Sequence, residues 1–77
     1  MMVKEFQKVI LNIDIPEHKL VKGDIGTVVM IHSRGYGFEV EFMTLDGETI
    51  TVSTLRASMV RPVTHKEIAH VRNLTLT

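Results

Sequence analysis

The segment at residues 37–43, GFEVEFM, alternates large apolar side chains with glutamate. In an extended chain Phe38, Val40 and Phe42 face one way and the two glutamates between them face the other. Because successive side chains of a strand point to opposite faces, this period of two predicts a strand that buries one face. The chain is therefore expected to fold around a sheet.

The rest of the chain is divided by Gly and Pro into short segments rich in β-branched residues, which favours strands. We expect strands near residues 5–12, 25–33, 37–44, 48–54 and 60–63, with a longer connection from Asp14 to Asp24. With 77 residues the chain has room for one domain with a small core. So short a sheet cannot bury its face while flat, and we predict a mostly β, five-stranded closed barrel at residues 1–63, followed by a tail at 64–77.

The loop between the third and fourth strands sets their register. A three-residue loop at 45–47 would pair Phe42 with Ile50. The same register pairs Val40 with Val52, so apolar side chains meet. A two-residue Asp-Gly turn would instead place Phe42 beside a threonine. The longer loop needs a left-handed residue at its last position, which is glycine here, and we predict the three-residue loop.

The preceding hairpin allows two registers. A two-residue turn at 34–35 pairs Ile31 with Phe38 and leaves Met30 on the outer face. A three-residue loop would instead turn Val28 and Met30 inward. We favour the first register.

The second strand begins at the sequence GDIGTVV. Gly23 and Asp24 predict a turn that delivers the chain into the strand. Gly26 lies inside the strand, where glycine indicates a bend or a close approach of another backbone. A bent strand is covered on both sides, and we expect Val28 and Met30 to be partly covered for this reason.

Two stretches resemble a known family: LNIDIPEHKLVKGDIGTVVMI and YGFEVEFMTLDGETITVSTLRASMVRPV. A leading strand is followed by D-x-P-x-x-x-L, G-D-x-G-T-V-V, a Y-x-V-E-F-like strand, a D-G turn and a T-L-R-A-like close with Arg-Pro. This order is similar to the bacterial family catalogued as Domain of Unknown Function 4926, over residues 6–63. The resemblance implies a small SH3-like barrel with a KOW-like segment, and no assigned activity. Small proteins of this kind are often encoded beside another small protein, which implies a partner from a neighbouring gene.

The sequence offers no catalytic or metal-binding constellation. No serine or threonine lies in a strand-to-helix elbow with a histidine placed as its base. His65 and His70 are five residues apart, which does not give one helical face, and a zinc site would need ligands from several elements. Glu39 and Glu41 share the outer strand face, where nothing separates their pKa values. We therefore expect no enzyme activity, no metal and no cofactor.

Composition bears on partners and location. Nine Lys and Arg balance nine Asp and Glu, whereas duplex-binding domains usually carry an excess of base. The chain has no cysteine, so it has no disulfide or thiolate metal site. No apolar run approaches the ~18 residues that cross a bilayer, and we expect no leader, since no basic-then-apolar segment opens the sequence. We expect a cytoplasmic protein without membrane contact.

The tail predicts a short helix. Thr64 and Glu67 have the spacing of a capping box, and Ile68 and Val71 share a helical stripe. A helix this short is not stable alone in water. We therefore expect the tail to dock on its own barrel or on another chain. Beyond it, a Leu-Thr alternation through Leu76 would extend as an edge strand, which is a template for pairing and indicates a dimer or a partner contact.

We expect the chain to be a non-enzymatic protein-binding module, in one form the accessory or antitoxin-like member of a bacterial gene pair. Its partner would be another protein or a second copy of itself. Tyr and Arg are favoured at interfaces. The predicted contact residues are Arg34, Tyr36, Arg56, Arg61, Ile68 and Val71. The alternative is a KOW-like RNA-binding domain, although only one tyrosine is available for base stacking.

Overall fold

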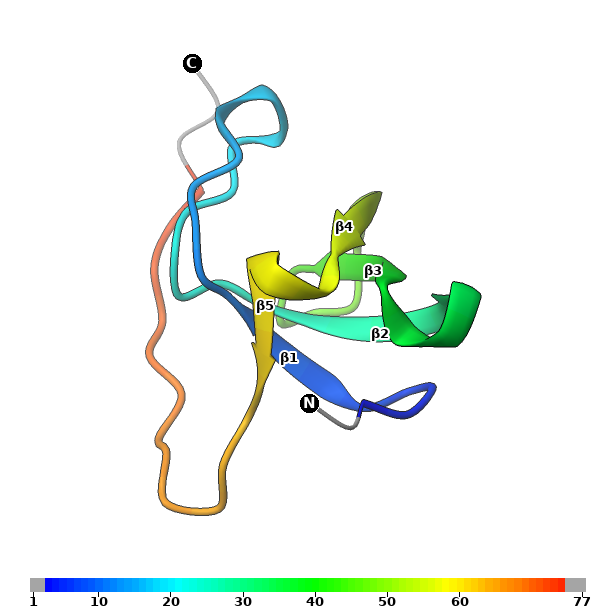
Figure 1. Ribbon diagram of the computed structural model, residues 1–77. Coiled ribbons are helices and arrows are strands. Elements are labelled where there is room, and N and C mark those ends of the chain that lie inside the picture. The colour runs from blue at the N-terminus through cyan, green and yellow to red at the C-terminus, as the bar shows by residue number, and fades with distance from the viewer. Residues whose placement is uncertain (1–2, 75–77) are drawn as a thin grey trace.

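The computed structural model describes residues 3–74, which contain all five expected strands (Figure 1). The strands are β1 (Lys8–Leu11), β2 (Ile25–His32), β3 (Gly37–Met43), β4 (Thr49–Arg56) and β5 (Val60–Pro62). Three short 3-10 turns join them: η1 (Pro16–His18), η2 (Ser33–Gly35) and η3 (Ala57–Met59). Among these residues no helix is long and apolar enough to span a membrane.

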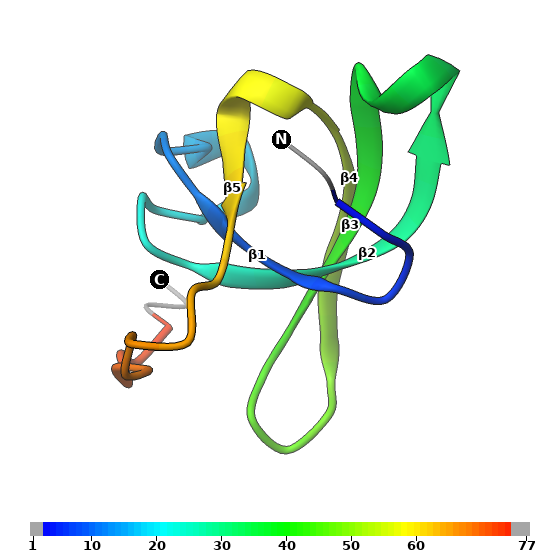
Figure 2. The same ribbon diagram turned by 60° about the horizontal axis from the view of Figure 1, so that its bottom comes forward.

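The strands form one antiparallel sheet in the order β4-β3-β2-β1-β5. Figure 2 shows β2 curving across the molecule from β1 to β3. The sheet is open, because β4 and β5 do not pair, so the expected closed barrel is not formed. Ile15 and Leu20, from the long connection between β1 and β2, are buried in the same core as the strands. The core is thus completed by loop side chains where strand pairing stops.

The core is a single apolar cluster. It includes the three side chains of β3 that the alternation pattern predicted to be inside. Its buried members are Val9, Leu11, Ile15, Leu20, Val28, Phe38, Val40, Phe42, Leu55 and Val60. Burial of this many apolar side chains is the main source of stability for so small a domain.

The three-residue loop of the β3–β4 hairpin is confirmed. Thr44 N–H donates to the Glu48 carbonyl at 2.8 Å, which closes the loop over residues 45–47. Gly47 has a φ of +90°, a left-handed conformation that glycine adopts without steric cost.

The predicted β3–β4 register is wrong beyond this loop. Phe42 pairs with Thr51 and not with Ile50, because the register shifts by one residue next to the loop. Ile50 is the extra residue of a β-bulge, a feature that alternation alone does not reveal. As a result Ser53 is buried opposite Val40, and Val52 lies half-exposed on the outer face.

The β2–β3 hairpin begins in the favoured register. Ile31 pairs with Phe38, and Met30 lies on the outer face. The register then shifts between Val28 and Met30, so that Val28 pairs with Val40 and is fully buried. The alternative register is therefore right for Val28 and wrong for Met30. Val28 is fully buried, and Met30, which is 51% exposed, is covered in part as expected.

Gly26 is a close approach of two backbones, as predicted. A Cβ atom placed on Gly26 would lie 2.5 Å from Val40 Cγ1, 2.8 Å from Phe42 Cε1 and 3.0 Å from the Glu41 carbonyl oxygen. Because there is no room for a side chain at this point, glycine lets β2 cross directly over β3.

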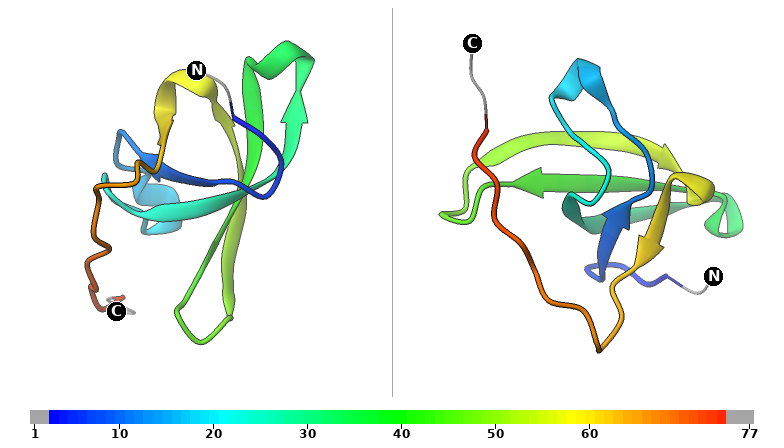
Figure 3. Two further views of the ribbon diagram at one scale, coloured as in Figure 1. Left: turned by 90° about the horizontal axis from the view of Figure 1, so that it is seen from below. Right: turned by 90° about the vertical axis from the view of Figure 1, so that its left-hand side faces the viewer.

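The predicted C-terminal helix is not formed. The capping-box contact exists, since Thr64 N–H donates to Glu67 Oε1 at 2.8 Å, but it closes only one turn. Figure 3 shows the chain then running along the outside of the molecule without regular structure. Leu74 is not in a strand, and Leu76 lies outside the described residues. The structure thus describes residues 64–74 of the tail.

Candidate functional site

The connection between β2 and β3 presents the predicted tyrosine at one end of the molecule. Its backbone turns through left-handed conformations at Arg34 and Gly35. Tyr36 is 75% exposed, although its backbone is fixed at both sides. Its N–H donates to the Ser33 carbonyl at 3.3 Å, and its carbonyl accepts from Ala57 N–H at 3.0 Å. The aromatic ring is therefore exposed to solvent while both backbone groups of its residue are hydrogen-bonded.

Arg56 lies beside this connection, because it pairs with Gly37 in the β3–β4 ladder. We call residues 33–36 together with Arg56 the tyrosine tip. A shallow depression at the tip is lined by His32, Ser33, Tyr36, Gly37, Thr54, Leu55, Arg56 and Met59. Among the described residues neither Arg34 nor Arg56 has a carboxylate within ion-pair distance. The tip thus combines an exposed aromatic ring with two uncompensated guanidinium groups.

Arg61, the other arginine among the predicted contact residues, lies apart from the tip. It lies on β5 and binds Glu67 of the tail with two hydrogen bonds of 2.9 and 2.6 Å. These bonds, together with the Thr64 N–H bond, lower the pKa of Glu67 to about 2. Arg61 therefore anchors the start of the tail.

The two apolar tail residues of the predicted site do not form a stripe. Ile68 is 95% exposed and Val71 is also largely exposed. An amphipathic helix would have put both on one docked face, but the tail is extended here. Of the six predicted contact residues, Arg34, Tyr36 and Arg56 are thus in the tyrosine tip, Arg61 is on β5, and Ile68 and Val71 are in the tail.

A second anchor holds the far end of the tail. Arg72 donates to both carboxylate oxygens of Asp24, at 2.7 and 2.6 Å, and to the Lys19 carbonyl at 3.1 Å. Partial burial opposes ionisation of Asp24, but hydrogen bonds from Arg72 and from Val21 N–H lower the pKa of its carboxyl below the ordinary value. The sequence indicated the turn role of Asp24. It gave no sign of Arg72, which lies 48 residues away.

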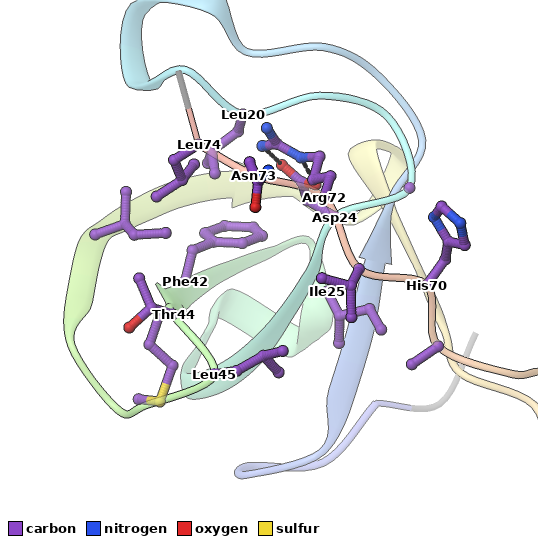
Figure 4. A pocket seen from close by; sticks show the side chains of 15 residues that line it. Leu20, Asp24, Ile25, Phe42, Thr44, Leu45, His70, Arg72, Asn73 and Leu74 are labelled. Atoms are coloured by element: carbon purple, nitrogen blue, oxygen red, sulfur yellow. Dashed lines mark hydrogen bonds and ion pairs between the residues drawn. The ribbon is translucent and has the colours of Figure 1, made fainter. Parts of the chain in front are cut away.

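A groove runs between the tail and the β3–β4 hairpin (Figure 4). Its volume is about 470 Å³, within the range of small-molecule sites. Its floor includes Phe42 and Ile50, and Leu45 stands exposed at its rim. The Arg72–Asp24 pair closes one side. We call it the tail groove; the sequence analysis missed it, since its walls meet only through the second anchor.

The outer face of the sheet carries a polar network. Glu39 Oε2 accepts from Thr54 Oγ1 at 2.7 Å and lies 2.6 Å from His32 Nε2. The Thr54 bond, then the histidine, lowers the pKa of Glu39. Glu41 accepts separately from Thr49 at 2.7 Å. The two glutamates therefore accept from different donors.

Metal ligands do not gather in the part of the chain that the structure describes. No group of three or more His, Cys, Asp or Glu side chains is close enough within residues 3–74 to hold an ion. The contact of His32 with Glu39, described above, joins two such side chains, which are too few for a metal site.

Comparison with known proteins gives one match. The model of a family described as a domain of unknown function, DUF4926, matches residues 5–62. The matched region contains all five strands and the tyrosine tip, and it ends before the tail. No curated protein and no solved structure matches the chain.

Proposed function

Since the chain belongs to the DUF4926 family, whose model matches most of its length, we propose that it is a non-enzymatic protein-binding module. The observation that carries the proposal is the tyrosine tip. Tyr36 is exposed on a fixed backbone, beside Arg34 and Arg56, which lack carboxylate partners among the described residues. Tyr and Arg are the side chains that most often dominate binding energy at protein interfaces.

The chemistry of the tip defines the partner. Two guanidinium groups favour a surface with exposed carboxylates, which they can bind in a bidentate manner. The tyrosine ring offers a large apolar area whose ordering on binding costs little entropy, since it has few rotatable bonds. The partner we propose is a protein with an acidic patch around a shallow apolar pocket, encoded by a neighbouring gene of a bacterium, with this chain as its accessory or antitoxin-like member.

The topology supports an SH3-like arrangement. The five antiparallel strands lie in the order β4-β3-β2-β1-β5, and a 3-10 turn joins β4 to β5. This arrangement is the one expected of small SH3-like barrels, which bind through loops at one end. The tyrosine tip is such a loop. The lack of cysteine suits a reducing compartment, and we place the protein in the cytoplasm.

The experiment is co-purification from the native host with a tagged chain, followed by reconstitution with the recovered protein. We expect one stoichiometric partner with wild type, and Tyr36→Ala or Arg34→Glu should weaken binding at least tenfold, or about 1.4 kcal/mol. Leu45→Ala, at the exposed tip of the other hairpin, is the matched control and should bind as wild type.

Two results would overturn the proposal. The first is the absence of any partner protein, or a partner whose affinity is unchanged by Tyr36→Ala. The second is co-purification of RNA that dissociates steeply with added salt, which would establish the KOW-like RNA-binding alternative.

A further inference from the structure

The two edges of the sheet differ in their protection. β5 has three residues and carries Arg61 and Pro62, features that discourage pairing with another strand. β4 has eight residues, with no proline, and no charge before Arg56. Natural sheets usually guard a long edge, because its free N–H and C=O groups are a template for another strand. β4 has a bulge at Ile50 near its start, but from Thr51 to Leu55 it carries neither proline nor charge, which indicates that this part of the edge is used.

The hydrogen-bonding pattern shows which groups of β4 are free. At one end of the β3–β4 ladder, Ala57 N–H donates to the Tyr36 carbonyl at 3.0 Å, so the next pair, Gly37 and Arg56, is of the non-hydrogen-bonded type and Phe38 with Leu55 is of the hydrogen-bonded type. In an antiparallel ladder such pairs alternate with pairs whose N–H and C=O groups point away from each other. Val52, Thr54 and Arg56 fall on the second set. In the described part of the chain, no hydrogen bond from outside the β3 ladder reaches their backbone groups.

The side chains of this edge are also accessible. Val52 is 50% exposed, and Thr54 and Arg56 are exposed with it on the outer face. Val52 is paired with Glu41 of β3, and Glu41 has no ion-pair partner among the described residues. Arg56 likewise lacks one. The same face of one chain therefore holds an unpaired cation at the edge and an unpaired anion one strand further in.

We propose that β4 pairs with β4 of a second copy of this chain, antiparallel, about a two-fold axis at Thr54. This register places Val52 opposite the partner subunit's Arg56. The two-fold symmetry also places Arg56 opposite the partner subunit's Val52. One row of side chains then contains Arg56, the partner's Val52 and the partner's Glu41. The standard Cα spacings of the two types of antiparallel pair place the Cα atoms of Arg56 and the partner's Glu41 about 10 Å apart. An arginine can cover the valine with its aliphatic stem and reach the carboxylate beyond it.

The symmetry of the contact is its main support. One two-fold operation joins two free edges and brings together two pairs of opposite charges, which is the self-complementarity that a closed dimer requires. The glutamates that would repel each other, Glu39 in each copy, are separated by two Thr54 residues and each has His32 beside it. The dimer shares Arg56 with the tyrosine tip but not Tyr36 or Arg34, so Val52→Lys and Glu41→Arg test the dimer alone and Tyr36→Ala tests the partner protein alone.

The first experiment measures molar mass by sedimentation over a concentration series of the full chain. Wild type should sediment as two chains. Val52→Lys should raise the dissociation constant at least tenfold, because it places a lysine beside the partner's Arg56. Met30→Lys is the matched control: Met30 is 51% exposed on the same face but belongs to β2, so this variant should remain a dimer.

The second experiment exchanges charges. Arg56→Glu and Glu41→Arg should each dissociate the dimer, and an equimolar mixture of the two variants should restore it, because opposite charges then meet in both rows. Restoration also shows that both variants are folded. A wild-type monomer at the highest concentration, a Val52→Lys dimer as tight as that of Met30→Lys, or a mixture that stays monomeric would each overturn the proposal.

Discussion

The sheet and the tail of this molecule lie against each other but are held by different forces. Residues 5–62, the family-matched region, surround one cluster of buried apolar side chains. The tail buries little: it is fastened by Arg61 to Glu67 at its start and by Arg72 to Asp24 near its end. Between these anchors its apolar side chains are exposed. The sheet should therefore respond to changes of side-chain volume, and the tail to changes of charge.

The largest effect is expected within the sheet, where side-chain volume should matter only for buried positions, and it compares two aromatic residues of the same hairpin. Phe38 is 1% exposed, and Phe38→Ala should lower the free energy of unfolding by about 3–5 kcal/mol, since it leaves a cavity. Tyr36→Ala, two residues away, should change it by less than about 0.5 kcal/mol, since that ring is exposed. Urea denaturation measures both. Equal losses for the two variants would contradict the assigned core.

A smaller effect is expected where β2 crosses β3. Gly26→Ala should cost about 1–3 kcal/mol, because the added methyl meets two side chains and a backbone oxygen that cannot all move away. Gly37→Ala is the control, since its Cβ would meet nothing closer than 3.4 Å. If both substitutions leave the urea midpoint unchanged, the close approach at Gly26 does not exist in solution.

The smallest effect concerns the tail and pH. Because the folded-state pKa values of Glu67 and Asp24 are lowered, their anchors contribute stability above the unfolded values of 4.5 and 3.8, and this is lost as pH falls through the folded values. The tail should stay attached from pH 7 to pH 5 and detach as pH approaches about 2, the pKa of Glu67. Heteronuclear NOE values of the tail amides measure this release.

Arg72→Ala sharpens the same experiment. It should free the end of the tail already at pH 7 while lowering the stability of the sheet by less than about 1 kcal/mol, as is usual for an exposed ion pair. Sheet amides serve as the internal control at every pH. Tail amides that remain as rigid as the sheet in Arg72→Ala, or in wild type at pH 2, would show that something other than the ion pairs holds the tail.

The strands could be predicted from the sequence because each carries a local signal. The alternation through Phe38, Val40 and Phe42 and the glycine at the end of the next loop act within a few residues, and the structure follows both. The register failed beyond the loop, because a bulge places one extra residue and the alternation on either side of it looks the same. Whether Val52 or Ser53 faces the core was decided by packing against β3.

The candidate site was less predictable than the fold. Arg34 and Tyr36 could be found because they are neighbours in a turn, and Arg56 joined them through the ladder. The tail could not, since each of its anchors depends on a single contact between distant residues. The capping-box spacing was real, but Glu67 also takes two hydrogen bonds from Arg61, and one turn does not make a helix.

The bulge at Ile50 has a consequence for how this surface can change. It shifts the alternation of side chains between the two faces of the sheet by one residue, so odd-numbered residues after the bulge face the core. Because Ile50 is the extra residue, deleting it would remove the bulge and leave Phe42 opposite Thr51 and Val40 opposite Ser53. A chain that kept Ile50 but lost the bulge would instead turn Val52 inward and Ser53 outward, so the bulge decides which side chains the free edge of β4 presents.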